Sequence, residues 1–86
     1  MNKPLLADGF DSAVLGLSRG PGDADVAVYS IDRCIDILVK RDGMSDDEAI
    51  EYMDFNVLGA YMGPMTPIFV YEMDAVSINE YAETLD

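Results

Sequence analysis

The strongest constraint on the fold is a predicted helix in the middle of the chain. The sequence has residues typical of a helix cap at both of its ends. Ser30 is a typical N-cap residue, because its hydroxyl can accept a hydrogen bond from a free N–H of the first turn. Apolar residues then recur at helical spacing, at Ile31, Cys34, Ile35 and Leu38. Gly43 follows, at a position where a left-handed conformation ends a helix. These signals predict a helix over about 31–41.

A second helix signal begins only a few residues later. Ser45 and Glu48 form a capping box, in which each residue satisfies a backbone N–H near the other. An apolar stripe follows at Ala49, Ile50, Met53, Val57 and Tyr61. The pattern predicts a helix over about 46–60. Because the connection is short, the two helices are expected to form a helical hairpin.

Three apolar runs have the composition of β-strands. Residues 13–17 and 26–29 flank a loop rich in Gly, Pro and Asp, which predicts a β-hairpin. The first run could instead extend a short helix that begins near Phe10. Residues 68–71 are β-branched and aromatic on both faces, so we expect this third strand to be central in its sheet.

The end of the chain predicts one more helix. Ser77 and Glu80 have the spacing of another capping box, and Ile78, Tyr81, Ala82 and Leu85 follow at helical spacing. The resulting order, β-β-α-α-β-α, predicts a small α+β domain with helices covering one face of a three-stranded sheet. At 86 residues the chain is expected to form a single acidic domain over 1–86.

The charge is strongly negative and unevenly placed. Seventeen acidic residues face five basic ones, and the net charge is −12. From Asp42 to the end the chain has eleven acidic residues and no Lys or Arg. Such a surface repels nucleic acid and anionic membranes and favours a protein partner with a basic surface.

Residues for catalysis or metal binding are sparse. There is no histidine, and Cys34 lies on the apolar stripe of its helix, where a cysteine acts as a small hydrophobe of low reactivity. Asp8 with Asp11, and Asp23 with Asp25, lie in turns without the full pattern of a calcium loop. The sequence therefore predicts no catalytic residue, no cofactor and no metal site. A small-ligand or metal-binding domain stays open as an alternative.

Two surfaces are candidates for partner binding. The first is an acidic face made of Asp42, Asp46, Asp47, Glu51 and Asp54. A solvated face that keeps the domain soluble would have the same composition. The second is an apolar, Met-rich segment, in which Leu58, Tyr61, Met62 and Met65 are candidates for self-association. Burial of this segment in the core is the alternative.

Cysteine usage and hydropathy bear on where the protein acts. One cysteine cannot form an internal disulfide, which suits a reducing compartment. No apolar run approaches about 20 residues, the length needed to span a membrane. The first residues lack the apolar core of a secretory signal. We therefore expect a cytoplasmic protein without membrane contacts.

Several strings along residues 8–71 resemble a group of small uncharacterised proteins of tailed bacteriophages. The likeness is carried by an overall pattern: Val28-Tyr29-Ser30, Cys34-Ile35, Arg41-Asp42-Gly43-Met44-Ser45, Glu48-Ala49, residues 55–61 and Thr66-Pro67-Ile68-Phe69. The resemblance implies a phage protein that acts in the host cytoplasm by binding another protein. It implies no activity and no functional residue.

These observations favour a non-enzymatic protein-binding module. In its sharper form the acidic face would imitate nucleic acid and occupy a basic groove of a host or phage protein. The alternative is a self-assembling structural or assembly component that binds its own copy.

Overall fold

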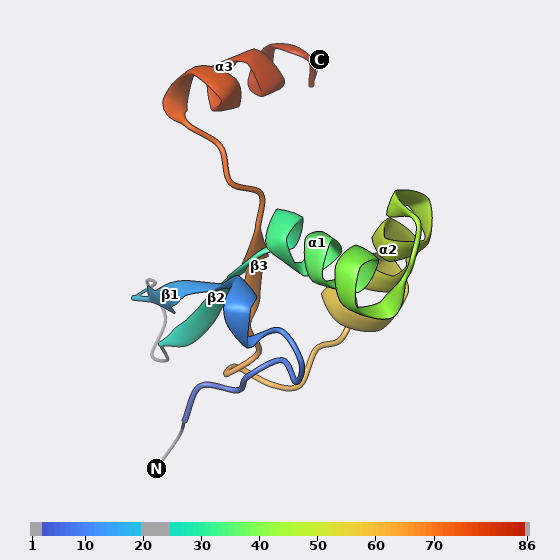
Figure 1. The fold of residues 1–86 in the computed structure, drawn as a ribbon. Helices are drawn as coiled ribbons and strands as arrows, with labels where there is room; N and C mark the ends of the chain where they lie inside the picture. Colours follow the sequence, from blue (N-terminus) through green and yellow to red (C-terminus); the bar gives the residue numbers. More distant parts are fainter. Residues whose placement is uncertain (1–2, 20–24, 86) are drawn as a thin grey trace.

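The computed structural model describes residues 3–19 and 25–85 (Figure 1). Its elements are a 3-10 turn (Asp11–Ala13), β1 (Val14–Ser18), β2 (Val26–Ser30), α1 (Ile31–Asp42), α2 (Asp46–Tyr52), a π-helix (Met53–Leu58), β3 (Ile68–Val70) and α3 (Ala75–Glu83). The predicted α+β order is confirmed, and the helical hairpin packs on a three-stranded sheet. The predicted hairpin loop lies largely at residues 20–24, outside the described residues.

The residues that lead into the sheet agree in part with both predictions for residues 13–17, a β-strand and a short helix that begins near Phe10. Phe10 precedes the 3-10 turn Asp11–Ala13, and β1 then starts at Val14. The register of β1 against β2 shifts between Val14 and Gly16, which is an irregularity of the bulge type. The predicted β-hairpin is thus present, with a short helical turn leading into it.

The strands are ordered β1-β2-β3, so the central strand is β2. β1 runs antiparallel to β2 and β3 runs parallel to it. The prediction that residues 68–71 form a central strand is wrong. Phe69 faces the core, but Ile68 stays 43% exposed and the far edge of β3 has no partner among the described residues. β3 is therefore an edge strand with apolar residues on both faces, and the face that carries Ile68 is only partly covered.

The core lies between the sheet and the helical hairpin. Tyr29 is fully buried, and its ring stacks on Phe69 with 5.2 Å between the ring centroids. Its hydroxyl oxygen accepts a hydrogen bond of 2.8 Å from the N–H of Ala7, which ties the N-terminal segment to the core. The other buried members of this cluster are Phe10, Ala13, Ala27, Cys34, Leu38, Ala49 and Met53.

The helix signals of the central region are confirmed. The Ser30 hydroxyl accepts a hydrogen bond from the Arg33 N–H, and Gly43 ends α1 with φ of 69°. The capping box of Ser45 and Glu48 is complete, with both reciprocal hydrogen bonds formed. Because these caps form between residues close in the sequence, the helical hairpin could be predicted from the sequence alone.

The predicted second helix is not α-helical throughout. After Tyr52 it continues as the π-helix Met53–Leu58, in which the hydrogen bonds reach five residues instead of four. The wider turn lets Met53, Val57 and Leu58 all pack against the core. Phe55 is left on the outside, 84% exposed.

α3 begins earlier than predicted. The N-cap is Asp74, whose carboxylate accepts a 2.8 Å hydrogen bond from the Ser77 N–H. The prediction of a capping box at Ser77 and Glu80 is wrong, because Ser77 already lies inside the first turn. Hydrogen bonding to Ser77 lowers the pKa of Asp74 below its ordinary value, so the cap is ionised near neutral pH.

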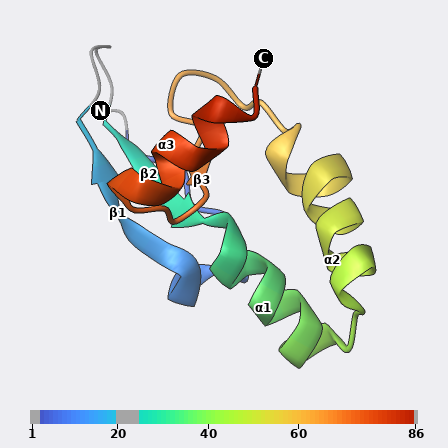
Figure 2. The same cartoon turned by 90° about the horizontal axis from the view of Figure 1, so that it is seen from above.

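α3 does not join the layer formed by the other helices. None of its residues is buried. Figure 1 shows it at the end of an extended segment, separated from the sheet and from α1, and Figure 2 shows it from above. The expectation that the helices cover the sheet therefore holds for the helical hairpin and not for α3.

Candidate functional site

The predicted acidic face lies mainly on α2 and the π-helix. All five of its residues are exposed. Asp47, Glu51 and Asp54 follow one another at spacings of four and three residues, which places them on one side of the helix. Asp46 lies beside them in the first turn. The structure thus brings three of the five predicted residues onto one side of the helix, with Asp46 in the adjoining first turn.

Asp42 is the exception, because its charge is already paired. It lies at the end of α1, and its two carboxylate oxygens accept hydrogen bonds from Arg41 Nε at 2.9 Å and Nη2 at 3.0 Å. The same guanidinium donates to the Gly9 carbonyl at 2.7 Å and lies over the Phe10 ring. Hydrogen bonding to Arg41 lowers the pKa of Asp42. Asp42 therefore contributes less to an external binding surface than the acids of α2.

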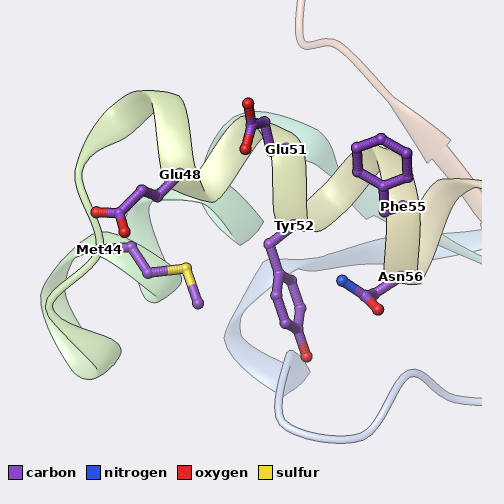
Figure 3. Close-up of a pocket in the computed structure, with 6 residues that line it drawn as sticks. All are labelled: Met44, Glu48, Glu51, Tyr52, Phe55 and Asn56. Atoms are coloured by element: carbon purple, nitrogen blue, oxygen red, sulfur yellow. The ribbon is translucent and has the colours of Figure 1, made fainter.

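A surface hollow joins this acidic helix to aromatic side chains. Its volume is about 320 Å³, and it is lined by Met44, Glu48, Glu51, Tyr52, Phe55 and Asn56. Figure 3 shows Glu51 and Phe55 extending to one side of the helix, and Tyr52 and Asn56 to the other. Met44 approaches from the turn between α1 and α2. We call these six residues the acid–aromatic hollow.

The lining of the acid–aromatic hollow suits a positively charged side chain. A carboxylate attracts an ammonium or guanidinium group directly, and an aromatic face adds a cation–π contribution. Glu48 Oε1 accepts the Ser45 N–H at 2.9 Å, and this hydrogen bonding lowers the pKa of Glu48. Glu48 is therefore negative near neutral pH even while it caps the helix. Glu51 makes no ion pair with another described residue.

Sequence reasoning missed Glu48, Tyr52 and Phe55 as site residues. Glu48 was explained by capping alone. A usable signal was present for Phe55, since this large apolar residue lies off the stripe that contains Ala49 and Met53. An apolar ring outside the buried stripe of a helix is a candidate for contacts with another molecule.

The four predicted self-association residues do not form one exposed surface. Leu58 is half-buried and packs against the core. Tyr61 and Met62 are 77% and 72% exposed. Met65 is half-buried, and its carbonyl accepts a hydrogen bond from the Leu5 N–H at 3.2 Å. Only Tyr61 and Met62 thus offer a free apolar surface, and their role in self-association stays a prediction.

The carboxylates considered for metal binding are not gathered. Among residues 3–19 and 25–85, no group of three or more His, Cys, Asp or Glu side chains could hold a metal ion. Asp8 and Asp11 are exposed in the N-terminal segment. Asp23 lies outside the described residues, so the pair that it forms with Asp25 is not described.

Cys34 is buried, and its ionisation is strongly shifted. Burial raises its pKa from 9.0 to about 11. We expect the thiol to resist a disulfide reagent near pH 8 in the folded protein and to react at once in denaturant, measured by release of the coloured thiolate. Rapid reaction in the native state would contradict the burial.

The same shift predicts a pH effect on stability. The unfolded thiol ionises near 9 and the folded one near 11, so Cys34 favours folding fully below pH 9 and loses this contribution as the pH rises to 11. The measurement is the free energy of unfolding between pH 9 and pH 11, compared with that of Cys34→Ala. This variant should lack the part of the decline that is due to the thiol.

Within the described residues, no helix is both long and apolar enough to cross a membrane. Comparison with protein-family models, with curated proteins and with solved structures finds no match to this chain. The functional interpretation of the candidate site therefore depends on the geometry and charge of its residues.

Proposed function

We propose that this protein is a non-enzymatic binding module that takes a basic segment of a partner protein on the outer surface of α2 and the π-helix. The observation that carries the proposal is the acid–aromatic hollow. Glu48, Glu51, Tyr52 and Phe55 all line it, with Glu51 and Phe55 on one side of the helix and Tyr52 on the other. A Lys or Arg side chain inserted there would meet carboxylates and aromatic faces together.

The exposed ring of Phe55 favours this function over a purely solubilising face. Solubility requires charge, and a large apolar ring in solvent opposes it. Aromatic residues are enriched at the centres of protein interfaces, where they contribute much of the binding energy. Asp46, Asp47 and Asp54 would then surround the contact and attract a basic partner during approach.

Imitation of nucleic acid is the sharper form of the same proposal. It requires that the basic groove of the partner normally bind phosphates, and the run of carboxylates along α2 supports it. The cytoplasmic setting and the phage origin that the resemblance implies stay predictions.

The test is a binding measurement with matched charge reversals. The probe is a labelled peptide of alternating Arg and Gly, and its fluorescence anisotropy is followed with the wild type and two double variants. Glu51→Lys with Asp54→Lys changes the proposed surface, and Glu80→Lys with Glu83→Lys makes the same charge change on α3. We expect the first to weaken binding more than about tenfold and the second less than about threefold.

Two further measurements distinguish binding at the acid–aromatic hollow from attraction by the net charge alone. They are the salt dependence of binding and the effect of Phe55→Ala. Raising the salt from about 0.05 M to about 0.5 M should weaken binding steeply, because exposed charges are screened. Phe55→Ala should weaken binding several-fold without changing the net charge. Equal losses in the two double variants, or no effect of Phe55→Ala, would refute the acid–aromatic hollow as the binding site.

A further inference from the structure

The segment after β3 leaves an apolar surface that no other part of the described chain, residues 3–19 and 25–85, covers. We call residues 71–85 the C-terminal arm. Four apolar side chains of α3 lie along one side of the helix, at Ala75, Ile78, Tyr81 and Ala82, and Leu85 follows just after the helix ends. The large ones are between 52% and 64% exposed, at Ile78, Tyr81 and Leu85. Val76 lies on the other side. The opposite side of α3 carries Glu80 and Glu83.

The surface area of the chain is too large for a compact monomer. It exposes 6358 Å², whereas a folded monomer of this size exposes about 5,000 Å². Its radius of gyration is 14.1 Å, against about 12 Å for a compact domain of 86 residues. A standard interface buries about 800 Å² on each partner. The excess over a compact monomer, roughly 1,400 Å² for the whole chain, is larger than the area that one partner buries in such an interface.

The base of the C-terminal arm is fixed in a projecting direction by Glu72. Its N–H donates to Asp32 Oδ2 at 3.2 Å, its Oε2 accepts the Ser30 hydroxyl at 3.0 Å, and its Oε1 lies 3.1 Å from Arg33 Nη2. Only Met73 separates Glu72 from the N-cap Asp74.

Docking of α3 on its own sheet would disturb this anchor. Ser30 is fully buried, and its hydroxyl donates to Glu72. Moving Glu72 away would leave that buried donor without a partner, which is costly. The anchor therefore favours a surface of another molecule as the cover for α3.

We infer that two copies of this chain form a twofold dimer through their C-terminal arms. The apolar face of each α3 packs against the same face of the other copy. It also packs over the hollow at the base of the partner's arm, which has a volume of about 510 Å³ and is lined by Val70, Tyr71, Met73 and Tyr81. A twofold interface needs one self-complementary surface, and exposed large apolar side chains recur along the arm at Tyr71, Met73, Ile78, Tyr81 and Leu85.

The charge distribution is compatible with a second copy. Each copy carries −12, but Glu80 and Glu83 lie away from the apolar face and stay in solvent in the dimer. The two chains still repel each other at long range, so the dimer should tighten as salt rises. Binding of a basic partner at the acid–aromatic hollow has the opposite salt dependence, so the two proposals fail separately.

The experiment is sedimentation velocity on the full chain from about 1 μM to about 1 mM, with three arm variants. Ile78→Asp and Leu85→Asp place a charge on the apolar face. Val76→Asp is the matched control, because Val76 lies on the opposite side of α3, is 65% exposed, and gains the same charge. We expect the wild type to dimerise. Ile78→Asp and Leu85→Asp should each raise the dimer dissociation constant more than about tenfold, and Val76→Asp less than about threefold.

The fold of each variant is monitored by protection of the Cys34 thiol, which lies in the core and not in the arm. A wild type that stays monomeric over the whole range would overturn the inference, whether α3 is free or docked on its own chain. Dimers that persist in both apolar-face variants, or that dissociate equally in Val76→Asp, would overturn it as well.

Discussion

Replacing Tyr29 by Ala is expected to lower the free energy of unfolding by about 3–5 kcal/mol, the largest loss that a single core substitution should cause in this chain. The side chain is fully buried, and its removal leaves a cavity beside Phe69 on the central strand. It also removes the acceptor of the Ala7 N–H. A small domain is marginally stable, so this loss is a large fraction of its total free energy of unfolding.

Urea denaturation followed by circular dichroism measures this effect. Tyr29→Phe is the matched control, because it keeps the ring and removes only the hydroxyl that accepts from Ala7. It should cost about 0.5–1.5 kcal/mol, in the range of one hydrogen bond. If the two variants lost the same stability, the hydrogen bond and not the packing against Phe69 would dominate at this position.

Met53→Ala is expected to lower the free energy of unfolding by about 2–5 kcal/mol. Met53 is 1% exposed and lies where α2 becomes the π-helix. Its side chain belongs to the same buried cluster as Tyr29 and Leu38, so truncation opens a cavity between the sheet and the helical hairpin. The same urea denaturation measures the loss.

Phe55→Ala, two residues further along, is the control for Met53→Ala. Because Phe55 is mostly in solvent, its truncation should change stability by no more than about 0.5 kcal/mol. A large loss in Phe55→Ala would mean that the ring packs inward, and the acid–aromatic hollow would then lose its aromatic wall. The pair therefore separates a folding role from a binding role within one helix.

The helical hairpin was predictable because its signals are local. Ser30, Gly43 and the capping box at Ser45 act through hydrogen bonds to backbone groups a few residues away. Their effect does not depend on the rest of the fold. The salt bridge between Asp36 and Lys40, at 3.1 Å, is local in the same way.

The position of β3 could not be read from its own residues. Whether an apolar strand is central depends on how many strands pair beside it. β1 already occupies one side of β2, so Ile68–Val70 pairs along the other side and remains at the edge. The prediction of the N-cap of α3 was wrong for a related reason. Asp74 and Ser77 are both typical N-cap residues, and the helix begins after the earlier one, Asp74.

The candidate site was predictable only in part. The charges of Asp47, Glu51 and Asp54 are visible in the sequence at helical spacing, and the structure places them on one side of the helix. The change to a π-helix at Met53–Leu58 was not visible in the sequence. A regular α-helical pattern does not anticipate a change of helix type.

The structure also divides the acidic residues by role. Asp42 pairs with Arg41, Glu72 holds the C-terminal arm, and Glu48 and Asp74 cap helices. Several of the acids after position 41 are thus required by the fold itself. The absence of Lys and Arg after position 41 is not explained by these roles, and it is one reason for proposing a basic partner.

The parallel pairing of β2 with β3 has a consequence for the order of folding. β1 and β2 are neighbours along the chain, whereas β3 meets β2 only after both helices have been traversed. Closing that long connection costs chain entropy before any strand contact forms. The hairpin of β1 and β2 and the helical hairpin should therefore assemble first, with β3 joining late. Until then one side of the central strand is open to pairing with other chains, and refolding at high protein concentration should favour aggregation.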